Sequence, residues 1–225
     1  TISSIAQILL KCFQTESLKN NSGHLHFKRI DFFDQKADQF WDKIKDRYDL
    51  AVERTSAYLN WKFKDQPFIK YQHYYVYHKE KLEGIVILRL AAPPEPPVGI
   101  ICECLSLYDS TEHLQIIIAN AKRILIKQGA IGVYCGSSAL NQEMALRRNG
   151  FLKLWSYPLM IYFKNLQDKP LSLFTALLSK GDHDLDEYPR ANQITLSDIL
   201  NIFKKNRPRI ILARKMASRL NILDL

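Results

Sequence analysis

Glu103 is the residue whose type and position in the sequence best suit it to catalysis. It lies within an apolar run at 99–107 (GIICECLSL), a pattern that predicts a buried strand. Burial raises the pKa of a carboxyl group, which suits a general base. A carboxylate held in an ion pair or at the solvent edge is the structural alternative. Strict alternation along the strand predicts Cys102 and Cys104 on one face, as small core residues, and Glu103 on the other.

Arg54, Tyr58 and Trp61 form a second candidate group. Their spacing places them on one face of a helix. Arg54 would then bind a carboxylate or phosphate bidentately, and Tyr58 would donate a proton. The alternative is a structural aromatic cluster, with Trp61 in the core and Arg54 capping it.

A third polar group follows the apolar run at 131–135. Ser137, Ser138 and Asn141 come after the carboxyl end of this predicted parallel strand, where ligands bind in open α/β sheets. A helix N-cap is the simpler interpretation.

An acidic stretch near the carboxyl end invites a metal interpretation. Oxygen and imidazole ligands recur there at Asp182, His183, Asp184 and Asp186, but the spacing fits no EF-hand loop. We therefore predict no metal and a solvated acidic loop.

The composition points to one well-filled core and a basic surface. The chain has 225 residues, 47% of them hydrophobic, a formal net charge of +9 and a pI of about 9.3. Such a charge favours anionic partners. The basic segments at 196–205 and 209–220 carry no known nucleic-acid motif, so we expect a packed helical hairpin with a solvated basic face and no nucleic-acid partner.

Cysteine usage and hydropathy bear on location. None of the four cysteines forms a Cys-x-x-Cys pair, so neither a disulfide framework nor a zinc site is implied, which suits a reducing cytoplasm. No apolar run is long enough to span a membrane. The sequence begins Thr-Ile-Ser-Ser, without an initiator methionine, and we expect it to come from a longer chain.

The elements expected to position these residues alternate along the chain. Apolar periodicity and turn signals predict helices at 2–13, 34–50 (capped by Asp34), from Asp109 or Ser110 to 128, and at 139–149, 173–178, 196–205 and 209–220. Strands are expected at 24–30, 71–77, 85–90, 99–107, 131–135, 152–155 and 159–163. The strands at 71–77 and 85–90 should form a hairpin, the proline-rich stretch at 91–98 an extended loop, and Gly129 and Gly150 should end helices. The strand–helix–strand order at 99–135 implies a right-handed parallel crossover.

This order of elements resembles the GNAT fold of acyl-CoA-dependent N-acetyltransferases, over roughly residues 25–163. Asn141 and the Gly150-Phe151 pair resemble that family's last-helix motif. The segment RTSAYLNWKF at 54–63, followed by Pro67 and Tyr71, is similar to a signature of one bacterial subgroup, Arg…Tyr-Leu-Asn-Trp-Arg-Phe. The resemblance implies an α/β (α+β) fold with a mixed, mostly antiparallel sheet, flanking helices and a basic C-terminal helical extension.

The resemblance also implies an activity and a site. We expect a GNAT-like domain over 1–168, an acidic loop and helical extension over 169–225, and a second, N-terminal domain in the full-length protein. The expected reaction is acyl transfer from acetyl-CoA or another acyl-CoA to a small amine, for example an amino sugar. Catalysis is expected from Glu103 and Tyr58, and substrate binding from Arg54 and Trp61. Acyl-CoA contacts are expected at Leu105, Leu107, Ser110, Thr111 and Asn141.

Two departures from the family pattern leave another function open. The turn at 107–112 lacks the glycine of the family's pyrophosphate loop and carries Asp109 and Glu112 instead. Leu146 stands where the family often has a tyrosine. The alternative is a catalytically degenerate domain with a structural or substrate-binding role beside an active partner domain, and an anion-binding role for the basic tail is a third hypothesis.

Overall fold

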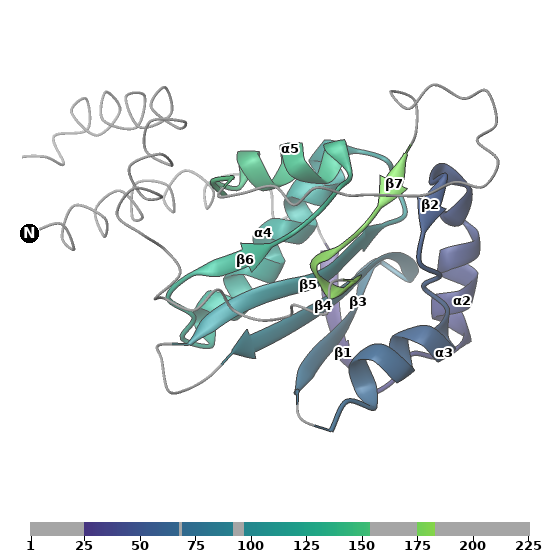
Figure 1. Ribbon diagram of the computed structural model, residues 1–225, viewed down its shortest axis with the longest axis horizontal. Helices are drawn as coiled ribbons and strands as arrows, with labels where there is room; N and C mark the ends of the chain where they lie inside the picture. The colour runs from purple at the N-terminus through teal and green to yellow at the C-terminus, as the bar shows by residue number, and fades with distance from the viewer. Residues whose placement is uncertain (1–24, 68, 92–96, 154–174, 183–225) are drawn as a thin grey trace, which may run out of the picture. The chain divides into compact units, whose positions relative to one another are not determined.

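The computed structural model describes residues 25–67, 69–91, 97–153 and 175–182 (Figure 1). The predicted helices at 2–13, 196–205 and 209–220 lie outside these residues, as do most of the strands expected at 152–155 and 159–163. Residues 25–146 and 175–182 belong to one compact unit, and 147–153 belong to a second. The predicted domain boundary at 168 and 169 falls outside the described residues and stays a prediction.

A five-stranded mixed sheet forms the centre of the first unit, in the order β1-β3-β4-β5-β6 (Figure 1). Its strands are β1 (Leu25–Ile30), β3 (Tyr71–His78), β4 (Lys81–Ala91), β5 (Val98–Ser106) and β6 (Val133–Cys135). All neighbours are antiparallel except β5 and β6, which are parallel. The predicted α/β class and the mostly antiparallel sheet are confirmed.

β3 and β4 form an antiparallel hairpin, which the sequence predicted. Aromatic and β-branched residues dominate β3, which favours a pleated, half-buried surface. The connecting turn needs only Lys79 and Glu80, and Lys79 adopts a positive φ of 54°. β4 therefore begins earlier, at Lys81, than the strand predicted at 85–90.

Helix α4 (Thr111–Lys127) connects β5 to β6 in the predicted crossover. Ser110 is its N-cap and accepts a hydrogen bond from the backbone N–H of His113 at 3.3 Å. Gly129 and Gly150 follow α4 and α5 (Leu140–Arg148) with positive φ angles of 96° and 83°. Both glycines end their helices as predicted, because a left-handed residue after a helix favours glycine.

The helix predicted at 34–50 is shorter than expected. Asp34 caps α2 (Gln35–Asp42), as predicted, and accepts a hydrogen bond from Lys36 N at 3.1 Å. The chain then forms a 3₁₀ turn, η1 (Lys45–Arg47), and a short strand, β2 (Leu50–Ala51).

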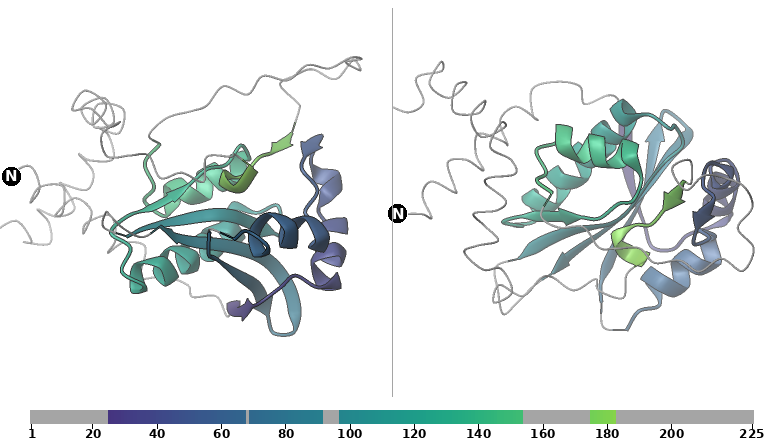
Figure 2. Two further views of the ribbon diagram at one scale, coloured as in Figure 1. Left: turned by 60° about the horizontal axis from the view of Figure 1, so that its bottom comes forward. Right: turned by 45° about the horizontal axis from the view of Figure 1, so that its top comes forward.

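Helices cover both faces of the sheet (Figure 2). The larger apolar core lies between one face and α2, α3 (Ser56–Leu59) and the π-helical turn η2 (Asn60–Lys64). On the other face α4 lies close enough to β5 that a side chain on Gly99 would clash with Leu125. The close approach of this helix therefore requires glycine at residue 99.

The helix predicted at 173–178 is wrong within the described residues. Ala176–Leu177 forms strand β7, which pairs in parallel with β2. The backbone N–H of Asp49 donates to Thr175 O at 2.8 Å. Partners distant in sequence, rather than local propensity, therefore set the conformation of this segment.

Candidate functional site

Strands β5 and β6 pair over a short stretch and then diverge. Parallel pairing joins 99–101 to 133–135. β6 ends there, whereas β5 continues to Ser106. Segment 175–182, which contains β7 and the 3₁₀ turn η4 (Lys180–Asp182), contacts the remaining part of β5 (Figure 2).

Two serines that follow β6 hold this segment in place. Ser137 forms an isolated antiparallel bridge with Ser179. Ser138 N donates to Leu178 O at 3.1 Å, Ser138 Oγ donates to Ala176 O at 2.6 Å, and Leu178 N donates to Ser138 Oγ at 2.8 Å. The polar groups of Ser138, which the sequence placed at a ligand-binding edge, thus bind the chain's own backbone.

A β-bulge in β5 sets the direction of Glu103. The pairing of β5 with β4 skips Cys102, and a bulge places two consecutive residues on one face. Cys102 packs in the core under α2 and α3, and Glu103 reaches Arg54 on the same side. Cys104 pairs with Val86, and neither belongs to that core. The predicted arrangement, with both thiols on one face and Glu103 opposite, is wrong because alternation fails at the bulge.

Glu103 lies in a buried ionic network centred on Arg54, whose side chain is 0% exposed. Arg54 Nε donates to Glu103 Oε2 at 3.0 Å. Its Nη2 donates to the Asp182 carboxylate, and its Nη1 donates to Val52 O. Ser179 Oγ donates to Glu103 Oε2 at 3.0 Å. The Arg54 guanidinium therefore donates hydrogen bonds to two carboxylates, Glu103 of β5 and Asp182 of η4.

The network has an excess of acid. With both carboxylates ionised, Arg54 leaves one negative charge uncompensated among these three side chains. Burial raises the pKa of Glu103 above its ordinary value, and the charge of Asp182 adds to this effect. The positive charge of Arg54 and the hydrogen bond from Ser179 act in the opposite direction. Glu103 is thus a carboxyl group with increased proton affinity, as a general base requires.

The predicted helical face of Arg54, Tyr58 and Trp61 does not form as expected. Thr55 is the N-cap of α3, so Arg54 lies before the helix rather than on it. Tyr58 and Trp61 contact each other, with ring centroids 5.8 Å apart. Trp61 is 62% exposed, so its assignment to the core is wrong. Burial raises the pKa of Tyr58, the negative charges of Asp182 and Glu103 add to this effect, and the positive charge of Arg54 opposes it.

Three of the residues expected to contact acyl-CoA meet at the start of α4. Asn141 Nδ2 donates to Asp109 Oδ1 at 2.6 Å, and Thr111 Oγ1 donates to Asn141 Oδ1 at 3.3 Å. Ser110 Oγ donates to Glu112 Oε2 at 3.1 Å. The turn thus has the N–H donors of a helix N-terminus, which favour anions, and two carboxylates, which oppose them.

The other two residues expected to contact acyl-CoA are buried. Leu105 belongs to the core, and Leu107 is 8% exposed. Leu107 O accepts a hydrogen bond from Arg47 Nη2, and Ser106 O accepts one from Arg47 Nη1 at 3.2 Å. Arg47 was not predicted, because it falls in a segment that the sequence assigned to one long helix.

Sequence reasoning also missed Ser179 and Asp182 as members of the site. The acidic stretch was expected to be solvated, but the Asp182 side chain is 6% exposed and pairs with Arg54. The other residues of the acidic stretch that were considered as metal ligands, at 183–186, lie outside the described residues. Within the part of the chain that the structure describes, no three His, Cys, Asp or Glu residues are grouped to hold a metal ion. In that same part, no helix is long and apolar enough to cross a bilayer.

Gly181 fixes the close approach of η4 to β5 and offers a direct test. An added Cβ would lie 2.6 Å from Phe63 Cζ and 3.2 Å from Cys102 O. Gly181→Ala should lower the free energy of unfolding by roughly 1–3 kcal/mol, because a packed ring and a backbone carbonyl must move. Urea denaturation measures the change. Gly132→Ala is the matched control: nothing lies within 4 Å of its added Cβ, and equal losses for the two variants would contradict this packing.

Comparisons with known proteins return structural similarities and no sequence family. No family model and no curated protein matches the chain. Among solved structures, it is similar to an aminoglycoside acetyltransferase from an uncultured soil metagenomic sample, determined with sisomicin and with trehalose. These two matches have 11% identity and a TM-score of 0.40, and cover 64% and 65% of this chain and 97% and 99% of that chain.

A third similar structure is a point mutant of a Thermus thermophilus protein, TTHA1254. The identity is 15% and the TM-score 0.37, with 63% of this chain and 99% of that chain covered.

Proposed function

We propose that this chain is an acyl-CoA-dependent N-acyltransferase that transfers an acetyl or other acyl group to a small amine, such as an amino sugar. The observation that carries the proposal is Glu103, a buried carboxyl group with a raised pKa at the point where β5 and β6 diverge. The choice of acyl-CoA as the acyl donor rests on the resemblance of the sequence to the GNAT family. A cytoplasmic location and an N-terminal second domain are parts of the same proposal.

In this proposal Glu103 accepts the proton that the amine loses, directly or through a water molecule. The free amine then forms the new bond to the acyl carbonyl carbon, the carbon–sulfur bond of the thioester breaks, and the second proton that the nitrogen loses on becoming an amide passes to solvent water. Tyr58 donates a proton to the leaving thiolate. The products are the N-acyl amine and the free thiol, and Glu103 and Tyr58 exchange protons with solvent before the next turnover.

The expected roles of Arg54 and Trp61 differ in how well the geometry supports them. Arg54 is fully buried and bound to two carboxylates, so it positions Glu103 rather than meeting the amine. Trp61 is exposed beside Tyr58, which suits contact with a substrate. At the start of α4, the N–H groups of the first turn would hold the cofactor phosphates. The hydroxyls of Ser110 and Thr111 would have to give up their bonds to Glu112 and Asn141 to take part.

One observation favours the second candidate function, a catalytically degenerate domain that supports an active partner domain. Glu103 is 2% exposed. It accepts hydrogen bonds from Arg54, Ser179 and the backbone N–H of Cys104. A carboxylate with these partners resembles a structural ion pair, and the amine reaches it only through a water or after segment 175–182 moves.

Calorimetric titration with acetyl-CoA distinguishes the two functions. The enzyme proposal expects saturable binding that weakens when Asn141→Asp adds a third carboxylate beside Asp109 and Glu112. Glu53→Gln, at an exposed residue before Arg54, is the control and should leave binding unchanged. No heat of binding at millimolar acetyl-CoA would overturn the enzyme proposal and leave the degenerate domain.

A further inference from the structure

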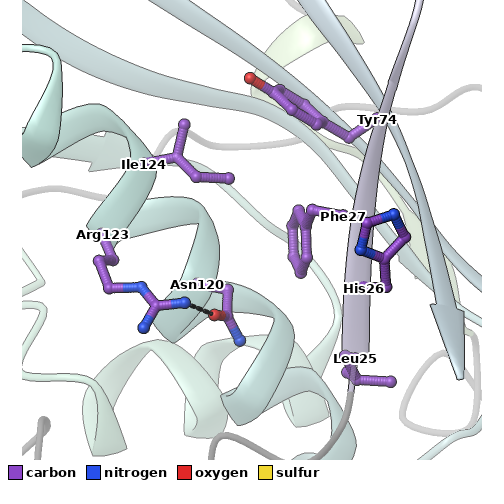
Figure 3. A pocket seen from close by; sticks show the side chains of 7 residues that line it. All are labelled: Leu25, His26, Phe27, Tyr74, Asn120, Arg123 and Ile124. Carbon is purple, nitrogen blue, oxygen red and sulfur yellow. Dashed lines mark hydrogen bonds between the residues drawn. The ribbon is translucent and has the colours of Figure 1, made fainter.

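A cavity of about 380 Å³ lies between α4 and the β1 edge of the sheet (Figure 3). This volume is within the roughly 300–1,000 Å³ range of small-molecule sites. β1 and β3 provide one side, and successive turns of α4 provide the other. The lining residues are Leu25, His26, Phe27, Tyr74, Asn120, Arg123 and Ile124.

Arg123 is the fixed cation of this cavity. Its Nη2 donates to Asn120 Oδ1 at 2.6 Å, as Figure 3 shows. Asn120 is itself 9% exposed, and its Nδ2 donates to Ile116 O at 2.9 Å. These two bonds fix the orientation of the Asn120 amide, which binds one N–H group of the Arg123 guanidinium. The other N–H groups of Arg123 can donate to a ligand.

The charge around Arg123 is not neutralised within the described part of the chain. None of the lining residues is acidic, and none of the ion pairs between described residues involves Arg123. A planar guanidinium with free donors matches a carboxylate, which it binds through two parallel hydrogen bonds. Because Arg123 carries one positive charge, it balances a ligand with one negative charge.

The remainder of the cavity wall is aromatic and aliphatic. Phe27 and Tyr74 lie side by side, with ring centroids 6.1 Å apart and planes inclined at 57°. Figure 3 shows the Phe27 ring on the side of β1 that faces α4, opposite Ile124. Tyr74 O–H donates to Gln72 Oε1 at 2.9 Å, so this hydroxyl already has an acceptor. These surfaces suit an apolar or aromatic body next to the carboxylate.

From this combination we propose that the cavity binds a small monocarboxylate with an aromatic or branched aliphatic body. Arg123, positioned by Asn120, binds the carboxylate, and Phe27, Tyr74 and Ile124 contact the body. The cavity lies on the α4 side of the sheet, whereas Glu103 points to the α2 and α3 side. The inference therefore does not depend on the proposed acyltransferase function.

The test uses phenylacetate as the probe and phenylacetamide, its neutral counterpart, as the comparison ligand. Chemical-shift titration of the full chain should show saturable binding of phenylacetate at the Phe27 and Tyr74 signals, at least about tenfold tighter than binding of the amide. Arg123→Gln should weaken phenylacetate at least about tenfold, a loss of about 1.4 kcal/mol. Arg123→Lys, which keeps the charge but not the planar fork, should give an intermediate affinity.

Lys127→Gln removes a positive charge from the same helix outside the cavity lining and should leave binding unchanged, which excludes a general charge effect. Unfolding temperatures within a few degrees of the parent establish that each variant is folded. Equal affinity for the acid and the amide would overturn the proposal. So would unchanged affinity in Arg123→Gln, tighter binding of inorganic phosphate than of phenylacetate, or no binding of phenylacetate.

Discussion

Replacing Arg54 by methionine should lower the free energy of unfolding by about 3–5 kcal/mol, the cost of removing one partner from a buried ion pair. Arg54 is the cation that the network provides for Glu103 and Asp182. Without it, two buried carboxylates remain beside each other, and at least one must take up a proton. Urea denaturation followed by circular dichroism measures the loss, which should be smaller at low pH, where Glu103, whose pKa is raised by burial, is protonated.

The matched control is Lys45→Met, which breaks an exposed ion pair between Lys45 and Asp42 with a nitrogen–oxygen distance of 2.7 Å. We expect no measurable change in the urea concentration at the midpoint of unfolding, because exposed ion pairs are well solvated. The triple change Arg54→Met, Glu103→Gln and Asp182→Asn removes all three charges and should recover part of the stability. An Arg54→Met variant as stable as the Lys45→Met variant would show that the network is not buried as described.

Replacing Glu103 by glutamine should lower kcat/KM for acyl transfer by about 10²–10⁴-fold, the usual contribution of a general base. The pH–rate profile of the parent should have an acid limb, in which the rate falls as Glu103 takes up a proton. This limb should lie above Glu103's ordinary pKa of about 4.5, because burial raises the pKa in the folded protein. The variant should lose the limb, since glutamine does not titrate.

The glutamine variant should fold, because Asp182 still neutralises Arg54 when Glu103 carries no charge. Asp34→Asn makes the same carboxylate-to-amide change at the N-cap of α2, outside the site, and should keep the parent rate. A Glu103→Gln variant that retains both the rate and the acid limb would rule out Glu103 as the base.

The elements of the fold that were predicted correctly are those whose ends are marked by residues nearby in the sequence. The hairpin of β3 and β4 follows from aromatic and β-branched residues around a short polar turn. The N-caps Asp34 and Ser110 and the helix-ending Gly129 identify the boundaries of α2 and α4. These features act within a few residues, so one sequence contains the information to place them.

The site was predicted only as separate pieces. Glu103 and Arg54 were both singled out, but their pairing across 49 residues was not, and neither was the contact of Arg54 with Asp182 across 128 residues. The bulge at Cys102 reverses the face that alternation assigns to Glu103. Trp61 is exposed although large aromatic residues usually pack in the core. Each difference depends on tertiary contacts that periodicity does not encode.

Product formation shows whether this chain transfers an acetyl group to an amine. The full chain is incubated with acetyl-CoA and a panel of small amines that includes amino sugars, and mass spectrometry detects the N-acetyl product while a thiol reagent measures free CoA. Acyl transfer with Glu103 as the base predicts an acetylated amine and an equal amount of thiol, both formed by the parent and the Asp34→Asn control and strongly reduced in Glu103→Gln. Equal product formation by the parent and Glu103→Gln, or no product from any amine with acetyl-CoA bound, would contradict it.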